Sequence, residues 1–251
     1  VDVRGVAEQV RASLDSNALA TPVIVSQDRR LTRGYTNASV AGDFGIHHIK
    51  FGGDLLFAPV REELDYAITD PSAFEDDVPE SLTFSDRRHD HEQSVFAQDT
   101  FTAGTLTASI GLRWDRYSFV VKDRALSPRL GAAWSLANGD VVLRASYDRV
   151  FQTPAVENLL LASSRVFEDV SPDAVTLPVL PSRGHFVEGG VTAALWRTAR
   201  LDVTAYRRTF SQFADDDVLL NTGVSFPIAF DSARVNGMDV KVTMPMRNRF
   251  S

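Results

Sequence analysis

The sequence predicts an all-β protein: an antiparallel, up-and-down transmembrane β-barrel fragment, with about ten long strands in a curved, open sheet. Three observations predict this class. Apolar and polar residues alternate with period 2 along much of the chain, the alternating runs are long, and tight turns alternate with long connections. The alternation is clearest from Leu106 to Ser118, where Leu, Ala, Ile and Trp fall on one face and Thr, Ser, Gly, Arg and Asp on the other.

Strand length separates this class from ordinary β proteins. A run of about twelve residues at ~3.4 Å per residue extends roughly 40 Å. A strand of that length, tilted by ~40°, crosses a hydrocarbon layer. Strands of soluble proteins are usually about half as long.

The alternating runs predict ten strands, and the first of them fits a helix equally well, because Val3 to Leu14 contains both periodicities. The expected spans are 2–14, 32–44, 46–66, 92–102, 105–120, 126–137, 140–151, 184–195, 199–213 and 233–244.

The connections alternate in length. Tight turns are expected at 43–45, 102–104, 137–139 and 197–199. Between them come the long, polar or Pro-rich segments 15–31, 67–91, 152–183 and 214–232, and only the connection near 122–124 departs from this contrast. Short turns on one side and long loops on the other are typical of outer-membrane barrels.

The composition excludes several classes. The 251 residues carry a net charge of −7, which disfavours nucleic acid as a partner, and contain no cysteine for disulfides, thiol chemistry or Cys-based metal sites. The mean hydropathy of −0.11 and the lack of a long apolar run argue against a helical membrane protein. The chain starts at Val1 without a signal peptide and ends directly after a strand-like run, so we expect a piece of something longer.

Four motifs, in order, resemble the barrel of TonB-dependent receptors, and their spacing agrees over roughly 46–244. They are Val95–Phe101 with Leu106–Tyr117 (containing GLRWD); Ser127–Gly131 (SPRLG) with Leu143–Tyr147 and Phe151–Pro154; Phe186–Gly190 with Leu201–Tyr206; and Val235–Val240. The family barrel has about 22 strands, so roughly half is expected to be missing. The N-terminal plug domain and the closing strand with its terminal aromatic residue are expected to be absent from this chain.

The resemblance implies a partial TonB-dependent receptor barrel over residues 1–251, in the outer membrane of a Gram-negative bacterium. Such a receptor binds a scarce small-molecule or glycan ligand, such as an iron chelate, cobalamin or a glycan. The TonB energy-transducing complex then drives import by engaging an N-terminal region, which is expected to be missing from this chain. Outer-membrane lipid would surround the barrel, and neither covalent chemistry nor a cofactor is expected.

Charged side chains on the polar face of the strands are the candidate ligand-contacting or lumen-facing residues. Pairing across strands, or with a plug, is the more common explanation of such charges, because any water-filled lumen must be polar. The candidates are Lys50, Asp54, Arg113, Asp115, Arg144, Asp148, Asp202, Arg208, Asp239 and Lys241.

The segment 152–183 is the first choice for extracellular ligand contact, because long ordered loops are often functional. It contains the candidates Phe167, Glu168 and Asp169, and a short helix is expected over Glu157 to Ser164.

Two weaker clusters, the acidic run 215–217 and His89–Asp90–His91, do not complete a metal site, so no metal is expected. No nucleophile–base spacing or phosphate-binding glycine loop is present, and we expect no enzyme.

Three alternatives remain open: a passive outer-membrane channel, a surface adhesin barrel and a soluble all-β protein. A soluble protein would cover its apolar face with a second sheet or with helices. Uptake that depends on the inner-membrane energy complex would separate an active transporter from the other two barrels.

Overall fold

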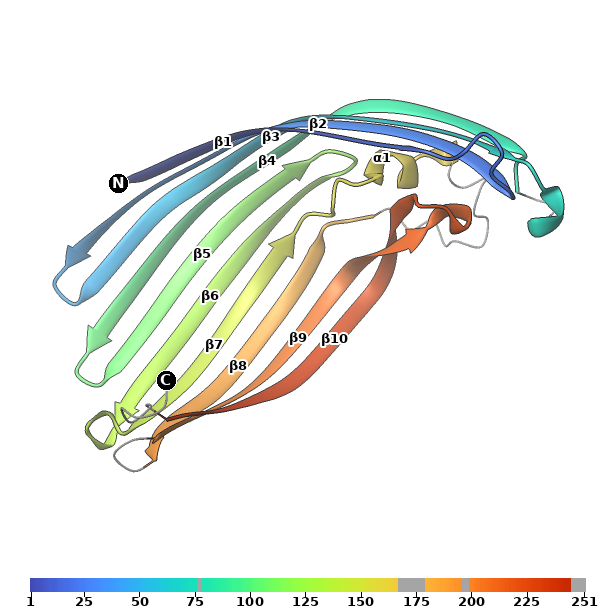
Figure 1. Ribbon diagram of the computed structural model, residues 1–251. Coiled ribbons are helices and arrows are strands. Elements are labelled where there is room, and N and C mark those ends of the chain that lie inside the picture. The colour runs from blue at the N-terminus through green and yellow to red at the C-terminus, as the bar shows by residue number, and fades with distance from the viewer. Residues whose placement is uncertain (76–77, 167–178, 196–198, 245–251) are drawn as a thin grey trace, which may run out of the picture.

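The computed structural model describes residues 1–75, 78–166, 179–195 and 199–244 and contains one ten-stranded sheet (Figure 1). Every strand is hydrogen-bonded to the next in sequence and runs antiparallel to it. The predicted fold class is confirmed, and the segment that also fitted a helix is the strand β1. The strands are β1 Asp2–Asp15, β2 Val23–Phe44, β3 His47–Ile68, β4 Ser81–Ala103, β5 Leu106–Ser118, β6 Lys122–Leu136, β7 Val141–Gln152, β8 Ser182–Leu195, β9 Ala199–Val218 and β10 Ser225–Thr243.

Tight turns collect at one end of the sheet, at the left and bottom of Figure 1. Gly45 and Gly104 adopt positive φ angles of 62° and 61°, a conformation that glycine takes without steric cost. Asn138 and Gly139 lie in the short helix η2 (Ala137–Gly139) between β6 and β7, also with positive φ. These turns occur where the sequence predicts them.

At the opposite end the connections are shorter than predicted, because β2, β4, β9 and β10 extend further than expected. The gap between β1 and β2 is 16–22 instead of 15–31, and the gap between β9 and β10 is 219–224 instead of 214–232. The β3–β4 connection, 69–80, contains the short helix η1 (Pro71–Ala73). Charged residues within these extensions, such as Asp28 to Arg30 on β2 and Asp86 to Arg88 on β4, make the sequence look like a polar loop.

The sheet is curved around a loop that enters its hollow. The short helix α1 (Leu159–Ala162) falls inside the range expected for a helix and contacts both β4 and β10, which lie six strands apart in the sheet order. One short helix can reach both strands only from the concave side (Figure 1). The backbone N–H of Leu161 donates to the Glu62 carboxylate (3.0 Å), so the side chains that alternate in phase with Glu62 line the concave face. We call the described residues 153–166 and 179–181, between β7 and β8, the inner loop.

An apolar cluster holds the inner loop against the extended ends of the strands. The side chains of Leu159 and Leu160 are fully buried. The cluster comprises Val23, Val25, Val60, Leu64, Tyr66, Leu82, Phe84, Leu160, Leu161, Leu219 and Val224.

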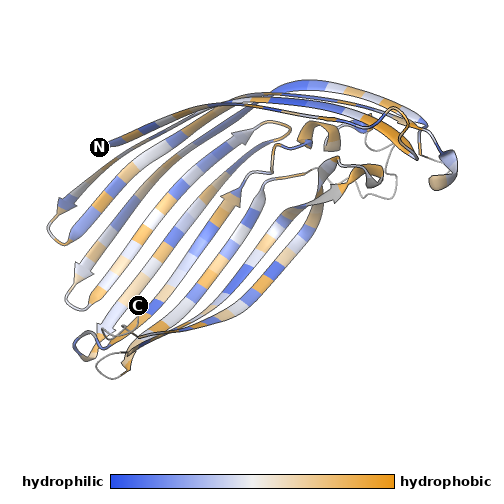
Figure 2. Ribbon diagram, in the orientation of Figure 1, coloured by the Kyte–Doolittle hydropathy of each residue, from blue (hydrophilic) through white to orange (hydrophobic). Residues whose placement is uncertain are grey.

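The convex face is apolar and uncovered. Phe51, Leu55 and Ile110 are 54%, 58% and 56% exposed, and Figure 2 shows hydrophobic and hydrophilic residues alternating along the strands. Within the described portion of the chain no second sheet and no helix covers this face. Such a surface needs an apolar environment in place of water, and the packing expected of a soluble β sandwich is not found.

The described helices are all short. None of them combines the length and the apolar character needed to cross a membrane.

Candidate functional site on the concave wall

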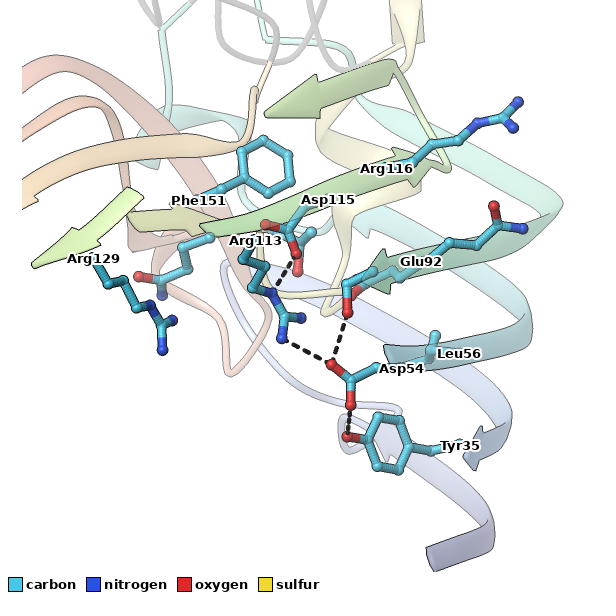
Figure 3. Close-up of a pocket in the computed structure, with 13 residues that line it drawn as sticks. Tyr35, Asp54, Leu56, Glu92, Arg113, Asp115, Arg116, Arg129 and Phe151 are labelled. Carbon is cyan, nitrogen blue, oxygen red and sulfur yellow. Dashed lines mark hydrogen bonds and ion pairs between the residues drawn. The ribbon is translucent and has the colours of Figure 1, made fainter. Parts of the chain in front are cut away.

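Asp54 on β3 is the centre of a polar network on the concave face (Figure 3). Its carboxylate accepts hydrogen bonds from the hydroxyls of Tyr35 (2.8 Å) and Ser94 (2.7 Å) and from the amide of Asn37. Cross-strand register explains the cluster, because Asn37, Asp54, Ser94 and Asp115 are consecutive partners in one row across β2, β3, β4 and β5.

Arg113 on β5 joins the two carboxylates of this row. Its guanidinium lies 2.8 Å from Asp54 and 2.7 Å from Asp115. The side chains of Asp54 and Asp115 are only 16% and 12% exposed, and carboxylates so far removed from water need charged partners. The donors of Arg113 are therefore engaged in holding the wall.

A pocket of about 360 Å³ opens beside this network. It is lined by β2–β7 side chains and by the start of the inner loop, including Phe151, Gln152 and Thr153. Among the described residues, Arg129 in its lining makes no ion pair. Its cross-strand partner by register is Asp148. Arg129 is therefore a cation available to a group that enters the pocket.

A second cluster surrounds Arg144 on β7. The Arg144 guanidinium donates to the hydroxyl of Thr192 (2.9 Å) and lies 3.6 Å from Asp202, and Thr192 in turn donates to Asp202. Arg200 lies 3.5 Å from the same carboxylate. This cluster joins β7, β8 and β9.

The other charged candidates lie apart from the pocket. The ammonium of Lys50 is 5.8 Å from the ring centre of Phe96, and Arg208 lies over the rings of Phe186 and Tyr206. Asp239 and Lys241 face Thr204 and Asp202 by register.

The structure thus brings together Asp54, Arg113 and Asp115 beside the pocket, and Arg144 with Asp202 elsewhere on the wall. Phe167, Glu168 and Asp169 fall outside the described residues. Sequence reasoning missed Tyr35, Asn37, Ser94 and Arg129. Their alternation on the polar face was visible in the sequence, but their register was not.

The inner loop is attached to the wall by polar contacts as well as by the apolar cluster. The side-chain amide of Gln27 donates to Asn158 (2.6 Å), and Asn158 donates to the Ser225 carbonyl. Glu62, which accepts the bond from Leu161, lies above the apolar band, because Arg61 and Glu63 on either side of it point outward and are charged. Burial raises the pKa of Glu62 to about 7.

No group of three or more His, Cys, Asp or Glu residues in the described portion of the chain has the arrangement of a metal site. His89 and His91 lie beside the Phe57 ring, at 5.6 Å and 4.9 Å. Asp70 accepts a bond from the Ser72 amide and caps η1.

The apolar, uncovered convex face, the polar concave wall and the tight turns at one end define the wall of an outer-membrane β-barrel. The family model "TonB dependent receptor-like, beta-barrel" matches residues 6–251, so the chain belongs to the TonB-dependent receptors. This membership places it in the outer membrane of a Gram-negative bacterium, in a family of receptors and transporters.

Solved structures share the fold at low sequence identity. The copper transporter OprC aligns with a TM-score of 0.67 at 16% identity, over 98% of this chain and 41% of its own. The ferric yersiniabactin uptake receptor FyuA from Yersinia pestis gives 0.66 at 11%, over 98% and 37%. The ferric citrate transporter FecA, in its unliganded form, gives 0.63 at 14%, over 96% and 36%. The chain therefore spans about two fifths of the length of these proteins.

A search of curated proteins found no match.

Proposed function

We propose that the full-length protein containing this barrel segment imports a scarce metal chelate, with energy supplied through TonB. Family membership supports a receptor or transporter in general. The neighbours OprC, FyuA and FecA are described as transporting or taking up copper, ferric yersiniabactin and ferric citrate. These descriptions favour metal chelates over the other ligand classes expected from the sequence, cobalamin and glycans.

The observation that carries the proposal is the position of the inner loop. It occupies the concave side of the sheet, is anchored by buried leucines and hydrogen bonds, and starts at the pocket beside Asp54. A passive channel needs an open lumen, whereas here a packed segment lies on the concave side and would have to move for a large solute to pass along this wall. An external energy source suits that requirement.

Arg129 is the residue that we propose for ligand contact within this segment. Metal chelates are often anionic through their carboxylates, and a guanidinium binds a carboxylate through two parallel hydrogen bonds. The guanidinium of Arg113 is already engaged by two carboxylates, so the proposal assigns it a structural role. A plug carboxylate is the alternative partner for Arg129.

The test uses the full-length receptor in a strain that lacks its own receptors for the ligands tested. Uptake of ferric citrate, ferric yersiniabactin and copper is measured with and without functional TonB. We expect the receptor to take up at least one of these ligands, and this uptake should stop without TonB. The Arg129→Ala variant should bind that ligand about tenfold more weakly. Arg149→Ala on β7 is the control, because Arg149 lies on the same convex face as Tyr147 and points away from the pocket.

The rival functions give different results in this assay. Uptake that continues without TonB would identify a passive channel. Binding without uptake in either strain would identify an adhesin or a non-transporting receptor. Equal ligand affinity in the Arg129→Ala and Arg149→Ala variants would remove Arg129 from the site without affecting the transport proposal.

A further inference from the structure

Four arginines form a continuous row on the convex face of the first four strands. Register pairs β1 with β2, β2 with β3 and β3 with β4 at these positions, so each arginine lies directly beside the next. We call this set the arginine row: Arg11, Arg30, Arg61 and Arg87.

The row faces outward and is accessible. The side chains of Arg11, Arg30 and Arg61 are 62%, 48% and 47% exposed, and Arg87 is exposed as well. Arg61 lies on the same face of β3 as Phe57 and Leu55, which belong to the uncovered apolar face. Its neighbour Glu62 lies on the opposite, concave face. In a closed barrel the row would remain on the outer surface.

The row lies directly above the apolar band. Toward the tight-turn end, the convex face of β3 and β4 carries first Phe57 with His89 and His91, whose rings lie within 5.6 Å of the Phe57 ring, and then Leu55, Val95 and Phe51. Amphipathic rings mark the membrane interface and aliphatic side chains the hydrocarbon. The arginine row is therefore at the level of lipid head groups on the long-connection side.

The protein does not neutralise the row by itself. Like charges side by side across strands are destabilising. Asp28 pairs with both Arg11 (2.5 Å) and Arg30 (2.8 Å), and Glu63 pairs with Arg61. Among the described residues Arg87 makes no ion pair. Two carboxylates thus pair with three of the four guanidiniums, and Arg87 is left without an ion pair in the described chain.

We propose that the arginine row is a docking surface for phosphate groups on glycolipid in the outer leaflet of the membrane. Guanidinium groups bind phosphate oxygens in pairs of parallel hydrogen bonds, and basic residues near an anionic membrane surface are attracted to it. Neighbouring guanidiniums would share the phosphates of one or two lipid molecules, and this would relieve their mutual repulsion.

The test uses the full-length receptor in phosphatidylcholine vesicles that contain a trace of fluorescent lipid A, a glycolipid carrying phosphate groups. Affinity is measured for intact and for enzymatically dephosphorylated lipid A, at low and high salt, and with inorganic phosphate as competitor. The variants are Arg30→Gln/Arg87→Gln on the convex face and Arg33→Gln/Arg88→Gln. The second pair lies on the same two strands but alternates onto the concave face.

We expect the wild type to bind phosphorylated lipid A more tightly than the dephosphorylated form. Its affinity for phosphorylated lipid A should be lower at high salt than at low salt. The convex double variant should bind about tenfold more weakly, while the concave double variant should match the wild type. Arg30→Lys/Arg87→Lys keeps the charge but loses the paired hydrogen bonds, so its affinity should lie between those of the wild type and the glutamine variant. Heat-modifiable gel mobility shows which variants are folded, and the lysine variant tests the proposal if the glutamine variant is not.

Four results would overturn the proposal. They are equal affinity for the two forms of lipid A, equal affinity in the convex double variant and the wild type, equal losses in the two glutamine variants, and loss of binding in a folded lysine variant to the glutamine level. Displacement of lipid A by inorganic phosphate at matched phosphate concentration would identify a free-phosphate site instead. None of these results depends on whether the receptor transports a metal chelate.

Discussion

Two regions of the wall differ in height. β2, β3 and β4 have 22, 22 and 23 residues, whereas β5, β6, β7 and β8 have 13, 15, 12 and 14. The tall region, β2–β4, carries most of the apolar cluster on its concave face above the membrane, and the β9–β10 connection adds Leu219 and Val224. The inner loop leaves the short region, β5–β8, and packs against that cluster. A strand that extends beyond the bilayer thus serves as a docking wall for a loop.

The largest expected effect is on the contact between the two regions. Leu160→Asp places a charge at a fully buried position in α1, which should cost about 4 kcal/mol or more of loop docking. Limited proteolysis of the full-length receptor in detergent should then show rapid cleavage in the inner loop. Leu19→Asp, at an 88% exposed leucine, is the control. Equal resistance in the two variants would mean that the apolar cluster does not hold the loop.

The next largest effect is the loss of stability when a charge is placed on the convex face. Leu130→Arg puts a charge into the apolar band of the short region and should destabilise the barrel by about 2–4 kcal/mol. Ser85→Arg, which lies beyond Arg87 on the convex face of the tall region, should have no measurable effect, because it is outside the hydrocarbon. Thermal unfolding in lipid vesicles measures both. Similar losses would show that the tall region does not extend beyond the membrane.

The third effect concerns the polar row that joins the tall and short regions. Arg113→Ala leaves Asp54 and Asp115 without their shared cation and should lower the free energy of unfolding by roughly 1–3 kcal/mol. The matched change Arg129→Ala removes a guanidinium that makes no ion pair within the described residues and should change stability little. Thermal unfolding of an Arg113→Ala barrel at the wild-type temperature would show that the row contributes nothing.

The fourth effect is a pH dependence of loop docking. The pKa of Glu62 is raised by burial from 4.5 to about 7, so the docked state holds a proton that the undocked state releases in this range. Docking should be strongest below pH 4.5 and weaken as the pH rises through 7. Amide hydrogen exchange in the inner loop, corrected for intrinsic rates, should follow this trend. Glu62→Gln should remove it, and Glu63→Gln on the convex face should not.

The same height difference decides which strands the sequence predicts well. For β5 and β7 the predicted spans 105–120 and 140–151 are close to Leu106–Ser118 and Val141–Gln152, because nearly all of each strand lies in the apolar band. For β2 the prediction 32–44 misses Val23 to Leu31. There the outward residues Asp28 and Arg30 are charged, and the buried positions Val23 and Val25 face a loop instead of lipid.

The sequence predicts on which face of the sheet the candidate residues lie, but not which of them contact one another. Alternation placed Asp54, Arg113 and Asp115 on the polar face, and the structure agrees. Which of the charges meet depends on register between strands joined by long connections, and local sequence does not determine that register. Asp54 and Asp115 lie in one row, whereas Arg144 meets Asp202 elsewhere on the wall. Whether these clusters contact a ligand stays a prediction.

Asn158 accepts a hydrogen bond from Gln27 on β2 and donates one to Ser225 at the start of β10. These strands lie eight positions apart in the sheet order, so the side-chain amide of Asn158 links two distant strands across the hollow. Withdrawing the inner loop would break both bonds together, so the two ends of the described sheet would lose this connection in one step.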